Sequence, residues 1–466
     1  MKKLFTIVQC LVFFVFGCNH QAIEISVPGW KAGVARIVIT PQQSMWMAGY
    51  AARDHASDGM IHDLWAKALA LEDSLGNHAL LITADILGFP KEVSERIKEQ
   101  LQQKLNLSKS QIILSASHTH SGPVLANSLK DIYPIDAIET EKIQQYTSIL
   151  EAKIVEVAVE AFRVMESVQI YAENGVSRFQ VNRRNNNDRN IAVLTELKGP
   201  NDFAVPVLKV VSHSGDIKAI VFGYACHPTV LDDYLWCGDY PGFAQIELEE
   251  KYPGTIAMFF LGAGADQNPL PRRTVPLAKQ YGQTLAASIE RVLEEPMRSL
   301  PAMLATAYDE INLPLSPAPS VAELELILTK TRSVSAYYRR WAERFIAETK
   351  NEIPPMTSYP YPIQVWNLGG QPIMTLGGEL VVEYAIGLKK MFGNDIFVMG
   401  YSNDVMAYIP SITILNEGGY EGDTSQQVYG LPSKWLPEIE PLIYEGMANL
   451  ASKVNIIQYK STINNK

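Results

Sequence analysis

The sequence predicts an α/β protein: a layered mixed sheet with helices, whose active site lies at the C-terminal ends of strands. Short apolar runs of strand type are interspersed along the chain with stretches of helical spacing. Polar and ionisable residues, histidines among them, follow directly after several of the apolar runs. Layered α/β folds bind ligands at the carboxyl ends of their strands. The functional residues are therefore expected where the predicted strands end.

The first part of the chain contains strand, helix and strand in succession. The run over 79–85 ends in Asp85, whose carboxylate either caps the following turn or belongs to the site. The expected elements are strands over 32–41, 64–73 and 79–85, a helix over 91–105 and a strand over 111–114.

The rest of the chain continues in the same way. Residues 205–211 and 219–225 are expected to be paired strands, joined by a turn at 212–215. The other expected elements are a helix over 138–166, a polar loop over 179–187, a helix after Gly242, a strand over 257–261, a helical stretch over 322–350, a linker over 354–362, a strand over 373–379, a helix over 381–391 and a strand over 396–399.

Composition excludes one class of partner. The chain has 466 residues and a net charge of -10, with 40 Lys and Arg against 50 Asp and Glu. A nucleic-acid-binding protein needs a basic surface, and no dense Lys/Arg cluster precedes the C-terminal tail. No nucleic-acid partner is therefore expected. A chain of this length forms one large core or two domains, and its oligomeric state stays open.

The N-terminus resembles a bacterial export signal of the lipoprotein type. Two lysines precede an apolar run over 4–16 that is too short to span a bilayer comfortably. The run ends in Gly17-Cys18, which resembles a lipobox. We expect a signal peptide over 1–17, a linker over 18–30 and one domain over 31–466. A lipidated Cys18 would then hold the protein at a membrane surface of the cell envelope, in the periplasm or outer membrane; otherwise the protein is secreted.

Two cysteines remain beyond the predicted anchor, Cys226 and Cys237. In an oxidising envelope they could form a disulfide or remain two buried thiols, and the sequence leaves both possibilities open. Their number excludes a cysteine-rich zinc site.

The segment from Ser117 to Pro123 contains His118 and His120, two residues apart, directly after an apolar run. Side chains at i and i+2 share one face of a strand, so both imidazoles can point into one pocket from a strand end. Neutral imidazole is the most frequent nitrogen ligand of Zn²⁺. Alone, the motif is equally compatible with polar side chains near a turn.

A third histidine repeats this arrangement. His227 follows the strand over 219–225 and precedes Pro228. Hydrolysis of an amide or ester by zinc needs three or four protein ligands, together with groups that stabilise the oxyanion and protonate the leaving group. The glycine-rich turn over 262–266 lacks the Lys-Ser/Thr of a phosphate-binding loop, so it is expected to form a wall of the pocket.

An ordered set of motifs from about Ala32 to Thr424 resembles the neutral (alkaline, non-lysosomal) ceramidases. The order of the pieces makes the resemblance specific, although no single piece is decisive. The matching stretches are Gly33-Val34-x-Arg36 with Thr40-Pro41, Met47-x-Gly49-Tyr50, Leu71-Glu72-Asp73, His118-Thr119-His120-Ser121-Gly122-Pro123, Asn182-Arg183, His227-Pro228-Thr229, Gly238-Asp239-Tyr240-Pro241-Gly242, Gly377-Gly378-Glu379, and Tyr408 followed by Tyr420-Glu421-Gly422.

The resemblance implies a zinc hydrolase that cleaves the N-acyl amide bond of ceramide, or of a related lipid, by metal-activated water. The products are a fatty acid and a sphingoid base. Zinc would be held by His118, His227, Glu379 and Tyr408. His120 would carry a proton to the leaving amine, and Arg183 and Tyr420 would hold the scissile carbonyl and the developing oxyanion.

The chain departs from the family pattern in two respects. Ceramidases carry a Gly-Asp-x-Ser-Pro-Asn type segment, whereas residues 264–269 contain no serine, which disfavours an acyl-enzyme on serine. The family also usually continues into an immunoglobulin-like domain, which is expected to be absent here. That absence bears on ceramide as the substrate more than on hydrolysis itself.

Two alternatives remain open. The same zinc chemistry could act on another N-acyl or ester substrate, or the chain could be a surface-binding lipoprotein without turnover. A deep acyl pocket rimmed by aromatic residues would favour ceramide, and a shallow polar cleft would favour another substrate. The aromatic residues in question are Trp46, Trp65, Tyr234 and Trp236, for each of which core packing is the commoner explanation.

Overall fold

The computed structural model describes residues 29–186, 193, 196–330 and 335–459. The predicted signal peptide over 1–17 and Cys18 lie outside the described residues, as does most of the predicted linker. Strand β1 (Trp30–Val38) begins at the last residue of that linker. Within the described ranges no helix combines the length and apolarity that crossing a membrane requires.

A nine-stranded sheet forms the centre of the molecule, with the order β11-β9-β8-β6-β1-β3-β4-β5 and β13 beside β6. The sheet is mixed: β4 with β5 and β9 with β11 are parallel, and the other pairs are antiparallel. Its strands are β1, β3 (Trp65–Glu72), β4 (His78–Ala84), β5 (Ile112–Ala116), β6 (Glu166–Val176), β8 (Ala204–Ser212), β9 (Ile217–Tyr224), β11 (Ile256–Leu261) and β13 (Arg298–Ser299). The predicted mixed sheet is thereby confirmed.

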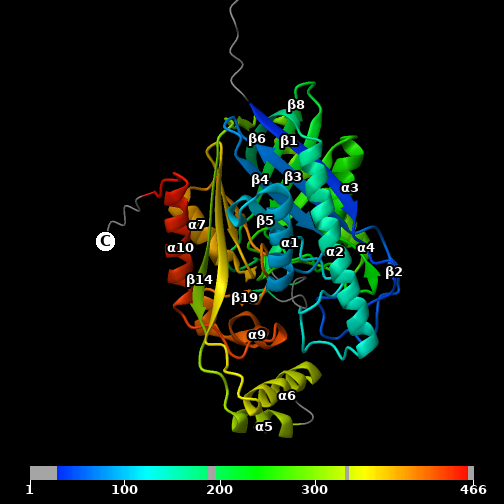
Figure 1. Cartoon of the computed structure of the whole chain (residues 1–466), viewed down its shortest axis with the longest axis vertical. Helices are drawn as coiled ribbons and strands as arrows, with labels where there is room; N and C mark the ends of the chain where they lie inside the picture. The colour runs from blue at the N-terminus through cyan, green and yellow to red at the C-terminus, as the bar shows by residue number, and fades with distance from the viewer. Residues whose placement is uncertain (1–28, 187–192, 194–195, 331–334, 460–466) are drawn as a thin grey trace, which may run out of the picture.

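Helices cover one face of this sheet (Figure 1). Alternate residues of β3, β4 and β5 pack against α1 and α2, and alternate residues of β8, β9 and β11 pack against α3 and α4. This period of two is what a strand between two layers requires. The helices are α1 (Lys91–Leu105), α2 (Ala137–Arg163), α3 (Asp239–Lys251) and α4 (Val275–Glu294), with a 3₁₀ turn η1 (Lys109–Gln111).

A second sheet packs on the opposite face. Its order is β14-β15-β16-β18, and Trp366, Leu368 and Phe397 meet the large sheet in one apolar cluster. Helices α7 and α10 cover its outer side, so the fold has four layers. The elements are β14 (Leu304–Pro314), β15 (Ser358–Leu368), β16 (Gln371–Leu376), β18 (Phe397–Met399), α7 (Val382–Phe392) and α10 (Ile439–Lys453).

Short elements complete the described chain. They are β2 (Gly59–Met60) with β10 (Leu235–Trp236), β7 (Gln180–Asn182) with β12 (Gln267–Pro269), β17 (Glu379–Leu380) with β19 (Tyr408–Ile409), α5 (Val321–Thr329), α6 (Ala336–Lys350), α8 (Ile412–Glu417), the π-helical turn η3 (Tyr420–Thr424) and α9 (Ser425–Val428). Figure 1 shows α5 and α6 at one end of the molecule, away from the large sheet.

Several expected elements need correction. The helix expected after Gly242 already begins at Asp239. The helical stretch over 322–350 is two helices, α5 and α6. The polar loop over 179–187 contains strand β7. The linker over 354–362 is wrong at its end, because β15 begins at Ser358. Its prolines, Pro360 and Pro362, precede the part of β15 that pairs with β16, which begins at Ile363; on that side the Pro362 carbonyl accepts from the N–H of Gly377 at 3.2 Å, a role that needs no N–H from proline.

Residues 401–403 run along the free edge of β5 and join the two sheets. Asn403 donates its backbone N–H to Leu114 O at 2.6 Å, and its side-chain oxygen accepts from the N–H of Leu114 at 3.2 Å. Its amide nitrogen donates to Gln364 on β15 at 2.8 Å, and Gln364 donates to the carbonyl oxygens of Ser110 and Ile112. The outermost strand of the large sheet is therefore covered by side-chain amides of the same chain.

Candidate active site

The candidate site lies where β5, β9 and β11 end, as predicted for an α/β fold. His118 follows β5, with a left-handed backbone at φ 60°. The expectation that His118 and His120 share a face of a strand is therefore wrong, because β5 has already ended at Ala116. The turn itself brings the two imidazoles together, with their Nε2 atoms 3.3 Å apart.

His118 and His227 are each held through Nδ1 by a backbone carbonyl. Leu87 O lies 2.6 Å from Nδ1 of His118, and Gly264 O lies 3.2 Å from Nδ1 of His227. A carbonyl oxygen only accepts, so each Nδ1 carries the proton and each Nε2 presents a lone pair. The two Nε2 atoms face one another at 3.1 Å. Two lone pairs at this distance cannot hydrogen-bond to each other.

Glu379 brings negative charge to the same point. Its Oε2 lies 3.3 Å from Nε2 of His118 and 3.5 Å from Nε2 of His227, while Oε1 accepts a hydrogen bond of 2.5 Å from Tyr429. Oε2 is buried and has no hydrogen-bond partner in the described part of the chain. Buried polar atoms are rarely left unpaired, and unpaired lone pairs that converge repel each other unless a cation lies between them.

This donor set fits a transition-metal ion of the zinc type. Zn–N distances of about 2.0–2.1 Å place tetrahedral ligand atoms about 3.3 Å apart, and the separations here are 3.1, 3.3 and 3.5 Å. His120 belongs to the same group, since the ligand atoms of the three histidines all lie within 4.8 Å of one another. The side chains that could hold a cation are therefore His118, His120, His227 and Glu379.

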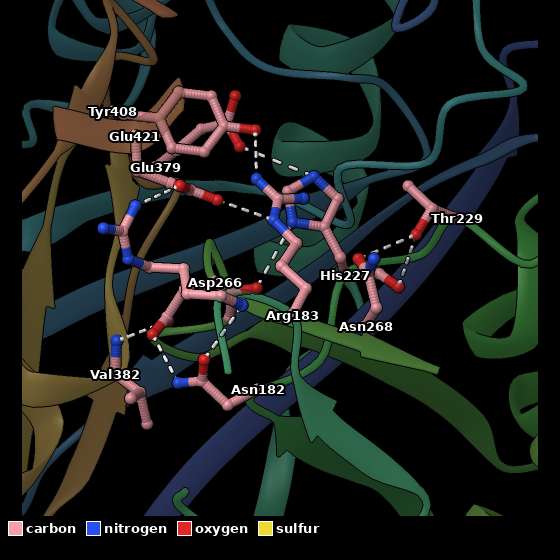
Figure 2. A network of polar contacts seen from close by, with 12 residues as sticks. Asn182, Arg183, His227, Thr229, Asp266, Asn268, Glu379, Val382, Tyr408 and Glu421 are labelled. Atoms are coloured by element: carbon pink, nitrogen blue, oxygen red, sulfur yellow. Dashed lines mark hydrogen bonds and ion pairs between the residues drawn. The ribbon is translucent and has the colours of Figure 1, made fainter. Parts of the chain in front are cut away.

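Sheet register places Tyr408 directly beside Glu379. The two residues pair across the parallel strands β17 and β19. The Tyr408 hydroxyl accepts a hydrogen bond of 3.2 Å from Nη2 of Arg183 (Figure 2). Burial, followed by the charge of Glu379, raises the pKa of Tyr408 well above its usual value. Tyr408 thus lines the site from the arginine side, and its role as a fourth ligand stays a prediction.

Arg183 and Tyr420 form the other side of the site. Nε of Arg183 donates to Oε1 of Glu421 at 2.8 Å, and the Tyr420 ring lies 5.2 Å from the Tyr408 ring. Burial opposes the charge of Arg183, but Tyr408 and Glu421 outweigh it and raise the pKa of Arg183. Tyr420 lies at the edge of the site and is 42% exposed. Both groups are therefore hydrogen-bond donors at neutral pH.

His120 stands between these two sides. Its ring lies 4.8 Å from the Tyr50 ring, and its buried Nδ1 has no hydrogen-bond partner among the described residues. Burial, followed by the neighbouring His118 and the positive charge of Arg53, lowers the pKa of His120 well below its usual value. The imidazole of His120 is therefore neutral and can accept a proton.

The cavity beside these groups is small, with a volume of about 20 Å³. Its apolar wall is aliphatic. The lining residues other than the site residues already named are Gly49, Leu87, Leu129, Ile132 and Val428.

None of the four aromatic residues expected at the rim lines this pocket. Trp46 and Trp236 are buried in the core between the large sheet and its helices. The guanidinium of Arg36 stacks on Trp65, and Tyr234 stacks on His55. The core and surface packing that is commoner for aromatic residues explains these four positions.

The glycine-rich turn over 262–266 was expected to form a wall of the pocket, but none of its residues lines the pocket described above; its Asp266 instead supports Arg183 from behind (Figure 2). Asp266 accepts from the backbone N–H of Val382 and from the Asn182 side chain, both at 2.9 Å, and its carbonyl accepts from the N–H of Arg183 at 2.8 Å. Burial raises the pKa of Asp266 to about 6. Asp266 thereby fixes the backbone of Arg183 against the start of α7. The two residues after it, Gln267 and Asn268, are amides without a nucleophilic oxygen.

Sequence reasoning missed Tyr429 and assigned no role to Glu421, although both contact site residues. Tyr429 follows the short helix α9 with no motif around it. Glu421 was part of a matching stretch, but its two arginine partners are more than 230 positions away. Cys226 and Cys237, for which a disulfide and two thiols were both possible, are free buried thiols in the described structure.

Comparison with known sequences points to one family. The sequence model described as "Neutral/alkaline non-lysosomal ceramidase, N-terminal" matches residues 30–267. Neutral ceramidase A of Dictyostelium discoideum is 26% identical over 304 residues, which cover 58% of this chain and 42% of the relative. Neutral ceramidase of Pseudomonas aeruginosa is 22% identical over 247 residues, covering 49% of this chain and 35% of the relative. The chain thus matches less than half the length of these curated relatives.

Comparison with solved structures gives the same fold over a larger share of the chain. The crystal structure of neutral ceramidase from Pseudomonas aeruginosa superposes with a TM-score of 0.70 at 17% identity, covering 93% of this chain and 76% of that one. A structure described as ceramidase complexed with C2 superposes with a TM-score of 0.69 at 16% identity, covering 93% and 77%.

Proposed function

Because its residues 30–267 match the sequence model of the family, the chain belongs to the neutral/alkaline non-lysosomal ceramidases, and we propose that it hydrolyses the N-acyl amide bond of ceramide or a related lipid. The products would be a fatty acid and a sphingoid base. Family membership supports a lipid amide as the substrate class, and the strand-end site supplies the chemistry.

One observation carries the proposal. Nε2 of His118, Nε2 of His227 and Oε2 of Glu379 meet with no hydrogen atom to share among them, in a place closed to solvent. A divalent cation satisfies all three at once, and Zn²⁺ is the ion that best suits two imidazoles and a carboxylate at these separations. A bound Zn²⁺ would supply Lewis acidity to the scissile carbonyl and lower the pKa of the attacking water.

The remaining steps are carried out by side chains of this chain. Neutral His120 accepts a proton from the attacking water and passes it to the leaving amine nitrogen. Arg183 and Tyr420 donate hydrogen bonds to the carbonyl oxygen while negative charge builds on it. Water rather than serine is the nucleophile in this scheme, because the segment over 264–269 has no hydroxyl to attack with.

A lipidated Cys18 would complement this activity. A tether in the cell envelope would keep the pocket at a membrane surface, where a ceramide-like lipid resides.

The small pocket leaves room for a second substrate class. A cavity of about 20 Å³ has no acyl-sized space, so its size does not favour ceramide over a short N-acyl amide or an ester. Both classes share the same reaction, so substrate comparison separates them.

The test is hydrolysis by the purified protein supplied with Zn²⁺. Ceramides with short and long acyl chains, simple N-acyl amines and esters are each incubated with and without a chelator, and released base or acid is quantified by mass spectrometry. We expect cleavage of ceramides that the chelator abolishes and Zn²⁺ restores. Preference for simple amides or esters would favour the second substrate class, and no cleavage of any of them would favour a binding protein without turnover.

A further inference from the structure

We propose that Glu421 is a positioning residue that orients both predicted oxyanion donors, Arg183 directly and Tyr420 through the turn that they share. This inference rests on the proposed function. Glu421 contacts neither the histidines nor the pocket lining described above, so it acts through its neighbours.

The carboxylate of Glu421 is divided between two guanidinium groups. Oε1 accepts from Nε of Arg183 at 2.8 Å, and Oε2 accepts from Nη1 of Arg184 at 2.7 Å. Its side chain is only 5% exposed. Charge-assisted hydrogen bonds with one carboxylate oxygen for each arginine are strong and directional, and burial shields them from solvent.

The bond at Nε sets the direction of the whole Arg183 head group. A guanidinium is planar, so anchoring Nε fixes the plane in which both Nη groups lie. In that plane Nη2 reaches the Tyr408 hydroxyl at 3.2 Å. The guanidinium carbon lies 5.9 Å from the Tyr420 ring. Arg183 is thereby held toward the reacting side of the site.

The ion pairs of Glu421 also restrain the turn that contains Tyr420. Gly418 and Gly419, with φ values of 69° and 81°, lead into the π-helical turn η3 that begins at Tyr420. Two glycines with positive φ give this entry wide conformational freedom. Arg184 restrains it by donating to the Gly418 carbonyl at 3.1 Å while it also holds Glu421. The position of Tyr420 therefore depends on the neighbouring carboxylate.

Glu417 offers a matched control. It also pairs with Arg184, at 2.8 Å, but it is 54% exposed and has no described contact with Arg183. Loss of Glu417 removes an equal charge from the same arginine on its solvent side. Only loss of Glu421 releases Arg183.

The experiment compares Glu421→Gln, Glu421→Asp and Glu417→Gln with the parent enzyme. Measured quantities are kcat and KM on a short-chain fluorescent ceramide, bound zinc, and Tm. We expect Glu421→Gln to lower kcat at least about tenfold with KM within about threefold and bound zinc unchanged, because donors to the transition state are misplaced. Glu421→Asp keeps the charge and should recover part of the loss, and Glu417→Gln should stay within about twofold.

A loss that appears as lower zinc content or lower Tm in proportion to activity would assign Glu421 a merely structural role and overturn the inference. So would equal losses in Glu421→Gln and Glu417→Gln. Failure of the proposed function is recognised separately, since the parent enzyme would then be inactive on ceramide. In that case the side-chain Nε–H signal of Arg183 in ¹⁵N-arginine-labelled protein decides: it should shift in Glu421→Gln and stay in place in Glu417→Gln, and no shift in Glu421→Gln would refute the contact.

Discussion

The two sides of the site are built in different ways. On the histidine side, His118 and His227 are fixed by carbonyls of loops that leave the large sheet, and both are at most 1% exposed. On the arginine side, Arg183 is held by an ion pair to Glu421 in a glycine-flanked turn, and Tyr420 in the same turn is 42% exposed. Backbone carbonyls set ligand geometry rigidly, as a metal requires, whereas side-chain ion pairs leave room for a substrate to settle.

The largest expected effect comes from breaking the histidine side. His227→Ala removes a nitrogen that no neighbouring group can replace, so we expect kcat/KM to fall at least about a thousandfold, together with loss of bound zinc measured by elemental analysis. His213→Ala, in an exposed turn, is the matched control and should leave both quantities unchanged. Retention of zinc and activity by His227→Ala would mean that the metal lies elsewhere.

A smaller effect is expected on the arginine side. Tyr420→Phe removes one donor to the carbonyl oxygen, which should lower kcat about 10- to 100-fold. Bound zinc and Tm should not change, because the hydroxyl stands at the edge of the site on a side chain that is 42% exposed. Tyr459→Phe, 63% exposed, is the control. Loss of zinc in Tyr420→Phe would show that the two sides are not separate.

Tyr429→Phe tests the support of the carboxylate. It removes the 2.5 Å hydrogen bond to Oε1 of Glu379 and leaves Oε2 in place. Loss of a residue that hydrogen-bonds to a metal ligand typically lowers metal affinity about tenfold or more. We expect zinc to bind about tenfold more weakly in a chelator competition, while kcat at saturating zinc stays within a few fold. Unchanged affinity would assign the orientation of Glu379 to its strand pairing alone.

The smallest expected effect is on stability and concerns Asp404, which contacts the backbone of Gly378, next to Glu379. Asp404 accepts a 2.7 Å hydrogen bond from Tyr359, and its backbone carbonyl accepts from the N–H of Gly378. Burial raises the pKa of Asp404 to about 7, above its unfolded value of about 3.9, so the folded state holds its proton more tightly. Its contribution to stability is full below pH 4 and is lost as pH rises through 7.

Asp404→Asn mimics the protonated acid and keeps an acceptor for Tyr359. We expect its Tm to exceed that of the parent by a few degrees at pH 8.5 and to match it at pH 4 to 5, measured by thermal unfolding across pH. The same Tm difference at both pH values would contradict the assigned protonation.

Local pattern predicted much of the fold. Helix α1 begins and ends at the expected residues, and β8 and β9 pair as expected, because period and turn signals are local properties. Pro360 and Pro362 misled the prediction of β15, since only three-dimensional pairing shows that β16 stops before them. Likewise His118 and His120 were expected on a strand, but a left-handed residue places them beyond it. The ion pair of Arg183 with Glu421 joins distant positions and leaves no local signal.

The side-chain amides of Gln364 and Asn403 that cover the edge of β5 matter when only part of the chain is expressed. The family match stops at residue 267, so a fragment comprising residues 30–267 would be a natural choice for expression. Such a fragment would lack Gln364 and Asn403, so the last strand of its sheet would show bare N–H and C=O groups to the solvent. Uncovered edges recruit further chains, and we expect that fragment to self-associate into insoluble material although it contains most of the large sheet.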